Sequence, residues 1–161
     1  MVTHARPLDI DDAPEVAAID RAYARAYGLE PRTSEASLRF FARSGHAFVA
    51  EGEGGVLGFV LAQPVFDGER PTLLVWRLAS PPPGDAAAVR ALTRALTKSA
   101  YDAGIYDVRV DLPDGDASGA EVLEAEAYGS VPTTAFARHL GSRAAAVAAA
   151  REARGEEGGH G

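Results

Sequence analysis

The sequence predicts an α/β (α+β) domain with a mixed, mostly antiparallel central sheet, helices on both faces and one parallel strand-helix-strand unit at its centre. Two observations carry this prediction. A mostly apolar strand, a proline and glycine loop, an amphipathic helix and an alternating strand follow one another over residues 72–112. Apolar segments separated by short turns over residues 46–80 predict an antiparallel meander that leads into this unit.

The amino-terminal segment predicts a strand and two helices. Residues 4–8 form a short first strand or its approach, and the acidic turn at residues 9–12 ends it and can cap the next helix. Steps of three and four residues give this helix an apolar stripe at Val16, Ile19, Tyr23 and Ala26. Residues 28–32 break the helix, and a second helix begins near Ser34 and stops at Gly45.

Three strands follow, joined by turns that contain glycine: residues 46–51, 56–62 and 72–80. The third is mostly apolar on both alternating faces, which suits a strand at the centre of the sheet with helices on both sides. Arg77 is its one charge, and a buried arginine needs an acidic partner or an edge position. We therefore predict a fold-specific ion pair at Arg77, with a substrate anchor as the alternative, and assign Trp76 to the core or to a pocket wall.

The next segment predicts a helix that crosses over to a parallel strand. Residues 81–84 are prolines and a glycine, which cannot continue a strand, and Asp85 has the side chain of an N-cap residue. A helix then runs from about Ala86 to Ala103, with an apolar stripe at Val89, Leu92, Leu96 and Ala100. Gly104 ends it, and residues 106–112 alternate as a strand. The loop therefore lies at the carboxyl edge of the sheet and opens a helix N-terminus, where ligands and anions usually bind.

The carboxyl-terminal part predicts a short helix, an extended segment and a tail. The helix covers about Ser118 to Glu126, and Tyr128 to Leu140 is extended and leads to the final strands. We assign residues 1–143 to one domain and residues 144–161 to an alanine-rich helix and a glycine-rich tail. The helix, residues 144–154, is marginal in water unless it docks, and the segment after it is predicted to be disordered.

Composition excludes several classes of function. The 161 residues contain no cysteine, which rules out disulfides and thiolate metal sites, and the four histidines lack ligand-like spacing, so we expect no metal. A formal net charge of −7 with unclustered basic residues argues against a nucleic-acid partner. No apolar run has the length of a signal sequence or a membrane span, so we expect a cytoplasmic protein with no membrane partner.

Several local segments form a recognisable pattern in the order of these elements. They are Arg6-Pro7 before Asp11-Asp12, Phe48-Val49-Ala50-Glu51 before a glycine turn and Leu57-Gly58-Phe59, Leu78-Ala79-Ser80-Pro81, and the apolar spacing from Pro81 to Gly104. Over about residues 6–140 the chain thereby resembles the GNAT superfamily of acyl-CoA-dependent N-acyltransferases. The resemblance implies the GNAT fold, acetyl-CoA or another acyl-CoA as co-substrate, and acyl transfer to a primary amine by direct attack in a ternary complex.

The resemblance also implies where the co-substrate binds, at the end of the central strand and the start of the following helix. The residues at these positions are Leu78, Ala79, Ser80, Gly84, Asp85, Ala86, Ala87, Ala88 and Val89. The backbone of Leu78 and Ala79 would polarise the thioester carbonyl. Amides at the helix N-terminus would converge on the pyrophosphate, which the small alanine side chains leave within reach.

The chain departs from the family pattern at this loop. The family has Gln or Arg, then Gly, then Gly or Ala where this chain has Gly84, Ala87 and Val89, and none of the three matches. Asp85 adds a negative charge beside the pyrophosphate; two charges about 5 Å apart at an effective dielectric near 20 repel by roughly 3 kcal/mol. The tyrosine that usually serves as general acid falls at Leu123, which cannot donate a proton.

Other residues are weaker candidates for a catalytic role. Tyr128 could reach the site from the end of the short helix, although packing at a strand start is the favoured alternative. Glu51 and Glu53 could serve as a base, but glutamates beside a hairpin turn are usually solvated. His46 and His139 stand at strand ends and are predicted to be surface or cap residues.

Two functions from different classes follow. The first is an N-acyltransferase, most simply an acetyltransferase acting on a small molecule or a peptide, which the intact spacing of the loop and helix favours. The second is a catalytically degenerate, GNAT-shaped binding or interaction module, which the departures at Asp85, Val89 and Leu123 favour. The acceptor pocket would lie against residues 28–33 and 67–70, and a homodimer is left open.

Overall fold

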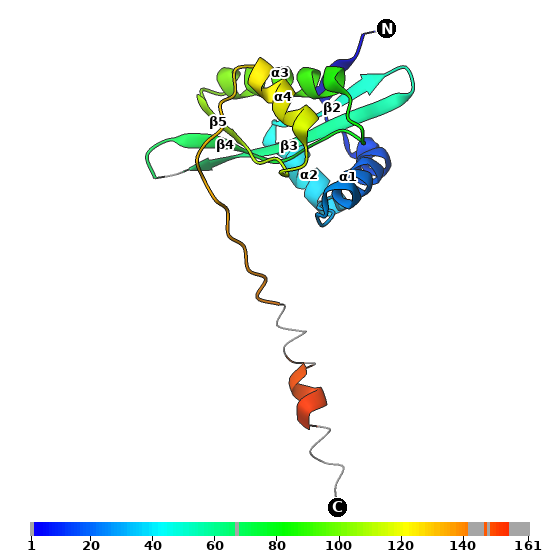
Figure 1. The fold of residues 1–161 in the computed structure, drawn as a ribbon, viewed down its shortest axis with the longest axis vertical. Coiled ribbons are helices and arrows are strands. Elements are labelled where there is room, and N and C mark those ends of the chain that lie inside the picture. Colours follow the sequence, from blue (N-terminus) through cyan, green and yellow to red (C-terminus); the bar gives the residue numbers. More distant parts are fainter. Residues whose placement is uncertain (1, 67, 142–146, 148, 155–161) are drawn as a thin grey trace, which may run out of the picture. The chain divides into compact units, whose positions relative to one another are not determined.

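The structure, a computed structural model, describes residues 2–66, 68–141, 147 and 149–154. One sheet contains the strands in the order β1-β2-β3-β4-β5 (Figure 1). Their bounds are β1 His4–Pro7, β2 Ala47–Gly52, β3 Gly55–Phe66, β4 Pro71–Ala79 and β5 Asp107–Val110. Neighbouring strands are antiparallel except for β4 and β5, which are parallel. The predicted mixed, mostly antiparallel sheet with one parallel unit is therefore confirmed, but this unit lies at one edge of the sheet and not at its centre, because β5 is the last strand in the order.

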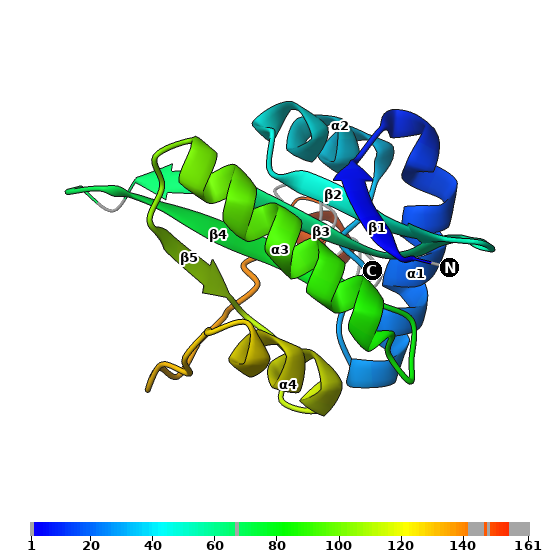
Figure 2. The ribbon, with the colours of Figure 1, turned by 90° about the horizontal axis from the view of Figure 1, so that it is seen from above.

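Helices cover both faces of this sheet, as predicted (Figure 2). Their bounds are α1 Ala13–Tyr27, α2 Glu35–Ser44, α3 Ala86–Asp102 and α4 Ala117–Ala125, and a short 3₁₀ turn, η1, covers Ile10–Asp12. Side chains from α3 and α4 share one apolar cluster with one face of the sheet, and side chains from α1 and α2 share a second cluster with the other face. The sheet is thus the middle layer of three.

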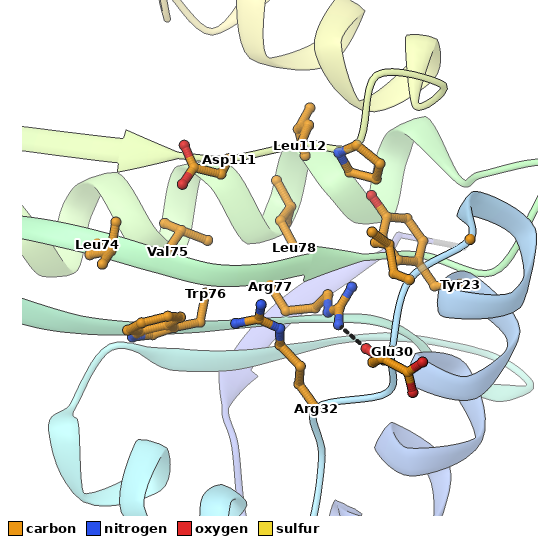
Figure 3. A pocket seen from close by; sticks show the side chains of 13 residues that line it. Tyr23, Glu30, Arg32, Leu74, Val75, Trp76, Arg77, Leu78, Asp111 and Leu112 are labelled. Atoms are coloured by element: carbon orange, nitrogen blue, oxygen red, sulfur yellow. Dashed lines mark hydrogen bonds between the residues drawn. The ribbon is translucent and has the colours of Figure 1, made fainter. Parts of the chain in front are cut away.

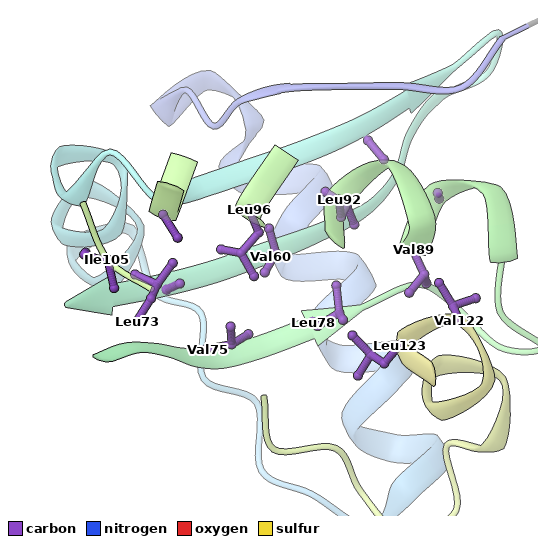
Figure 4. Close-up of a cluster of buried hydrophobic side chains, with 14 residues drawn as sticks. Val60, Leu73, Val75, Leu78, Val89, Leu92, Leu96, Ile105, Val122 and Leu123 are labelled. Carbon is purple, nitrogen blue, oxygen red and sulfur yellow. The ribbon is translucent and has the colours of Figure 1, made fainter. Parts of the chain in front are cut away.

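The α3 face contains an apolar cluster that sequence periodicity predicts well (Figure 4). All four residues of the predicted stripe, Val89, Leu92, Leu96 and Ala100, are buried. Asp85 caps the helix, since its carboxylate accepts a hydrogen bond of 2.9 Å from the Ala88 N–H. Gly104 follows the helix with a φ of 72°, the left-handed conformation that favours glycine.

The α1 stripe differs from the prediction at its last position. Val16, Ile19 and Tyr23 are buried, but Ala26 is exposed, and Tyr27 packs against the cluster instead. The reason is the aromatic pair at the end of the helix: the rings of Tyr23 and Tyr27 lie 4.7 Å apart between centroids, so the stripe continues by a step of four.

The chain divides into two compact units, Met1–Gly129 and Ser130–Gly161. The final strands expected within residues 128–140 are wrong, because no strand is found over residues 128–141; a strand needs pairing partners as well as β-propensity. Residues 149–154 are helical, in agreement with the predicted alanine-rich helix. The tail predicted to be disordered, residues 155–161, lies outside the described residues, and the domain boundary after residue 143 stays a prediction.

Candidate functional site

The site begins with an irregularity in β4. On one edge β4 pairs with β5 only from Thr72 to Val75, whereas on the other edge its pairing with β3 continues to Ala79. Arg77 and Val75 face consecutive residues of β3, so Trp76 between them is the extra residue of a β-bulge. A bulge bends a strand and increases its twist. The carboxyl-terminal half of β4, beyond Val75, is therefore not paired with β5.

The bulge also exchanges the faces to which β4 side chains point. Before it, Leu73 and Val75 belong to the cluster under α3; after it, Leu78 belongs to that cluster and Ala79 belongs to the cluster under α1. A shift of one residue reverses the alternation of a strand. Arg77, which shares the phase of Ala79, consequently lies on the α1 side of the sheet, where its ion partner is.

A cavity of about 470 Å³ lies where β4 and β5 part (Figure 3). It is lined by Leu74 to Leu78 of β4, by Asp111 to Pro113 after β5, by Tyr23 of α1, and by Gly28, Leu29, Glu30 and Arg32 of the α1–α2 loop. Residues of the segment 28–33, against which an acceptor pocket is predicted, therefore line this cavity. Of the other predicted segment, residues 67–70, the described residues 68–70 are not among the residues that line it.

Arg77 is buried beside the cavity and pairs with Asp20 of α1. Its Nε lies 3.2 Å from Asp20 Oδ1, and its Nη2 donates a hydrogen bond of 2.8 Å to the Glu30 carbonyl oxygen. The contact between Nε and Oδ1 is an ion contact without hydrogen-bond alignment, since neither atom has a hydrogen-bond partner. Burial lowers the pKa of Arg77, and the Asp20 charge opposes that decrease. The predicted ion pair is confirmed.

Asp20 is held by the loop that closes the cavity. Its Oδ2 accepts hydrogen bonds from the Arg32 N–H at 2.6 Å, the Thr33 N–H at 3.0 Å and the Thr33 hydroxyl at 3.0 Å. The Arg32 guanidinium lies over the Trp76 ring, 5.8 Å from its centroid. Trp76 is 39% exposed and forms a wall of the cavity, in agreement with one of the two predictions for it.

Tyr23 joins α1 to the start of α4. Its hydroxyl donates a hydrogen bond of 2.5 Å to Asp116 Oδ2. Asp116 Oδ1 caps α4, because it accepts a hydrogen bond of 2.9 Å from the Gly119 N–H. Both side chains are buried. Burial and the Asp116 carboxylate raise the pKa of Tyr23, so its hydroxyl keeps its proton. Sequence reasoning missed this contact; the cap spacing from Asp116 to Gly119 was the one available signal.

The predicted co-substrate residues come together at the start of α3. Ser80 accepts a hydrogen bond of 3.1 Å from the Asp85 N–H and donates one of 3.0 Å to the Leu57 carbonyl oxygen. Gly84 has a φ of 94°, and a side chain there would meet Ser118 Oγ at 2.6 Å. Ser80 and Gly84 thus shape a tight loop between β4 and the helix N-terminus.

Within the first turn of α3, the amides are not equally available. The Ala88 N–H donates to the Asp85 carboxylate at 2.9 Å, and the Val89 N–H donates to the Asp85 carbonyl oxygen at 3.0 Å. Ala88 and Val89 are buried, whereas Ala86 and Ala87 are exposed. Ala86 and Ala87 therefore carry the amides that an anion can approach.

The family model named "Protein of unknown function (DUF1999)" matches residues 11–155 of this chain. The chain belongs to the DUF1999 family. TTHA1254 of Thermus thermophilus has the same fold with 37% identity, a TM-score of 0.73, and coverage of 87% of this chain and 99% of that chain. No curated protein matches this DUF1999 chain.

Two more distant solved structures identify the fold of the DUF1999 protein. The ribosomal-protein-alanine N-acetyltransferase of Brucella melitensis biovar Abortus 2308 is 19% identical, with a TM-score of 0.66 and coverage of 86% of this chain and 100% of that chain. A predicted acetyltransferase of Clostridium acetobutylicum, solved with acetyl-CoA, is 15% identical, with a TM-score of 0.62 and coverage of 85% and 96%. The DUF1999 protein has the GNAT fold.

In the DUF1999 protein, the side chains of Leu123 and Tyr128 lie away from the cavity, whereas the predicted backbone candidates lie beside it. Leu123 is buried in the cluster under α3. Tyr128 packs against the same cluster, with its hydroxyl 2.8 Å from Thr97 Oγ1, and is not among the residues that line the cavity. Leu78 lines the cavity and Ala79 ends the same strand, so the two backbone candidates are at the point where β4 and β5 part.

Glu51, Glu53 and His46 also lie away from the cavity. Glu51 forms an ion pair of 2.6 Å with Arg6, and Glu53 is exposed beside the hairpin turn. The prediction that His46 is a surface or cap residue is wrong: it is 7% exposed, and its Nδ1 lies 2.9 Å from Ser99 Oγ. Burial lowers the pKa of His46. Sequence position alone could not indicate that α3 covers the start of β2.

Over the described residues of the DUF1999 protein, no group of three or more His, Cys, Asp or Glu could hold a metal ion. Within the same ranges, no helix has both the length and the apolar character that a membrane crossing requires.

Proposed function

We propose that this DUF1999 protein transfers an acetyl group from acetyl-CoA to a primary amine of a small molecule or peptide. The supporting observation is the release of β4 from β5 beyond Val75, with a cavity at that point, in a chain of the GNAT fold. One structural neighbour is a ribosomal-protein-alanine N-acetyltransferase, and another is an aminoglycoside acetyltransferase. An amine acceptor is the common feature that we extend to this chain.

Two parts of the chain fit the co-substrate, and one part opposes it. The unpaired β5-side edge of residues 76–79 offers backbone groups to an extended amide-containing arm, and the amides of Ala86 and Ala87 offer donors to phosphate oxygens. Asp85 opposes it, because its carboxylate already accepts from the Ala88 N–H and repels a phosphate. We therefore expect modest affinity rather than none.

The chain itself needs to supply mainly position and a fixed dipole. When bound, acetyl-CoA supplies the acyl group as an activated thioester. The peptide groups of Leu78 and Ala79 are held by the pairing of these residues with Val60 and Phe59 of β3, so their dipoles are fixed at the end of β4, beside the opening between β4 and β5. The cavity orients the amine next to this point. Such catalysis by proximity does not require a residue equivalent to the missing tyrosine at Leu123.

A binding module without turnover is the second candidate function. The observation that favours it is the carboxylate of Asp85 at the N-terminus of α3, together with the buried side chains of Val89 and Leu123. In this case the cavity binds its amine but no acyl transfer follows. A cytoplasmic location and a homodimer stay predictions under both functions.

A thiol-release assay separates the two candidates. The chain has no cysteine, so a thiol reagent reports only the CoA that the reaction liberates. We expect CoA release above the hydrolysis background with at least one member of a panel of amino acids, dipeptides, polyamines and aminoglycosides. The variant Ala87→Glu, which puts a second carboxylate beside the helix N-terminus, should abolish it. Background rates with the whole panel, from folded protein that binds acetyl-CoA, would support the binding module instead.

A further inference from the structure

Two guanidinium groups face the same cavity. Arg77 projects from β4 and Arg32 from the α1–α2 loop, and Figure 3 shows the two side chains close together. The Arg32 charge is near enough to lower the pKa of Arg77, as two like charges do. An anion that binds between two guanidinium groups offsets the repulsion between their positive charges.

The acidic groups around the cavity only partly neutralise this pair. Asp20 is the one carboxylate in contact with the Arg77 guanidinium in the described part of the chain, and its Oδ2 already accepts three hydrogen bonds. Glu30 contacts Arg77 through its backbone carbonyl, and its carboxylate points away from Arg77 (Figure 3). Asp111 forms an ion pair of 3.3 Å with Arg109 outside the cavity. Asp20 therefore neutralises one of the two guanidinium groups, and no carboxylate in the described part of the chain stands between them.

Arg77 also has donors to spare. Its Nε is directed to Asp20 and its Nη2 donates to the Glu30 carbonyl oxygen, whereas Nη1 has no hydrogen bond within the described part of the chain. A buried donor without an acceptor destabilises the fold unless another group accepts from it. The planar guanidinium matches the two oxygens of a carboxylate.

We propose that the acceptor amine carries a carboxylate, and that Arg77 and Arg32 bind this carboxylate in the cavity. The proposal rests on the proposed function and names its substrate class: short peptides or amino acids with a free carboxyl end. Arg77 stands two residues before Ala79, so their Cα atoms lie roughly 7 Å apart along the strand. The apolar walls at Trp76 and Leu112 favour an apolar side chain.

Calorimetry without acetyl-CoA tests the proposal. The probes are glycyl-phenylalanine and its C-terminal amide, which differ only in the carboxylate. We expect the acid to bind at least about tenfold more tightly than the amide, because a charge-assisted hydrogen bond is lost. Arg32→Gln should lower the affinity for the acid by a similar factor and leave the affinity for the amide unchanged. Arg32→Lys should lower the affinity for the acid less. Arg39→Gln is the matched control, since Arg39 is exposed on α2 and pairs with Glu35.

The outcomes divide cleanly. Equal affinity for acid and amide, an unchanged acid affinity in Arg32→Gln, or no binding of either probe to folded protein would overturn the proposal. A second variant, Arg77→Lys, keeps the charge opposite Asp20 but removes the planar guanidinium. It should also lower the affinity for the acid about tenfold. Since no acetyl-CoA is present, an absence of acyl transfer leaves this result intact. Conversely, acetyl transfer to amides as fast as to acids would support the proposed function and overturn this inference.

Discussion

The two faces of the sheet bury different kinds of side chain. The face under α3 and α4 buries a continuous apolar cluster (Figure 4). The face under α1 and α2 buries an apolar cluster too, but it also holds the Arg77–Asp20 ion pair and the Tyr23–Asp116 hydrogen bond beside the cavity. The same strand, β4, serves both faces, and the bulge at Trp76 decides which side chain goes to which. The bulge thus places the Arg77–Asp20 ion pair on the α1 side of β4, opposite the cluster under α3.

The strongest test of this contrast is to break the ion pair on the cavity face. Arg77→Met should reduce the free energy of unfolding by about 3–5 kcal/mol, because it leaves the Asp20 carboxylate buried without its cation. The double variant Asp20→Asn with Arg77→Met should recover a large part of that loss. Urea unfolding followed by circular dichroism measures both. Equal destabilisation in single and double variants would show that the charge pairing is not what matters.

The apolar face should respond to lost volume instead. Leu92→Ala truncates a fully buried side chain of α3 and should cost about 2–5 kcal/mol. Leu112→Ala, in the half-buried wall of the cavity, should cost only about 1 kcal/mol, since less apolar surface is lost. The same urea titrations give the comparison. A cost at Leu112 equal to that at Leu92 would mean that the cavity wall is ordinary core.

The hydrogen bond from α1 to α4 should contribute less than the Arg77–Asp20 ion pair or the Leu92 side chain. Tyr23→Phe removes the donor to the Asp116 carboxylate and should cost about 1.5–3 kcal/mol at neutral pH. The pKa of Tyr23 is raised, so this contribution is fully present below the ordinary tyrosine pKa near 10 and is lost only as the pH rises through the higher folded value. Tyr101→Phe, at a side chain that is 71% exposed, is the control and should change little.

The smallest effect concerns the edge of the apolar face at His46. Ser99 Oγ donates to the Leu96 carbonyl oxygen, so it accepts from Nδ1–H of a neutral His46. Because burial lowers the pKa of His46, its contribution is complete above about 6.5 and is lost as the pH falls through the folded value. The melting temperature should therefore fall between pH 7 and pH 5, and less so in His46→Gln. The exposed His139 gives the control variant His139→Gln, in which the fall should match that of the parent.

Periodic features were predictable from the sequence, and irregular ones were not. The α3 stripe, the Asp85 cap and the parallel β4–β5 pair follow from spacing and from residues with strong local preferences. The bulge at Trp76 has no such signal, because an extra residue in a strand is fixed by the register of its neighbour. The pairing of Arg77 with Asp20 depends on that bulge, so only the need for an acidic partner could be predicted.

The site was predictable to the same limited degree. The residues at the start of α3 come together as the resemblance implied, because they are close in the chain. Arg32, Tyr23 and Asp111 meet β4 only through the packing of α1 and the end of β5, and the sequence gives no local sign of that contact. The packing of Tyr128 against the α3 cluster likewise depends on tertiary contacts, because an aromatic residue after a short helix has the same local sequence whether it packs or faces a cleft.

Binding of acetyl-CoA, measured by titration calorimetry, tests the central claim most directly. We expect saturable heat with the parent protein, and a roughly ten- to hundredfold higher affinity in Asp85→Asn, which keeps a capping side chain and removes the charge at the start of α3. Asp102→Asn, at the other end of the same helix, should leave the affinity unchanged, and Ala87→Glu should abolish binding. No heat with either the parent or Asp85→Asn, both shown to be folded, would contradict the account of an acyl-CoA-dependent enzyme.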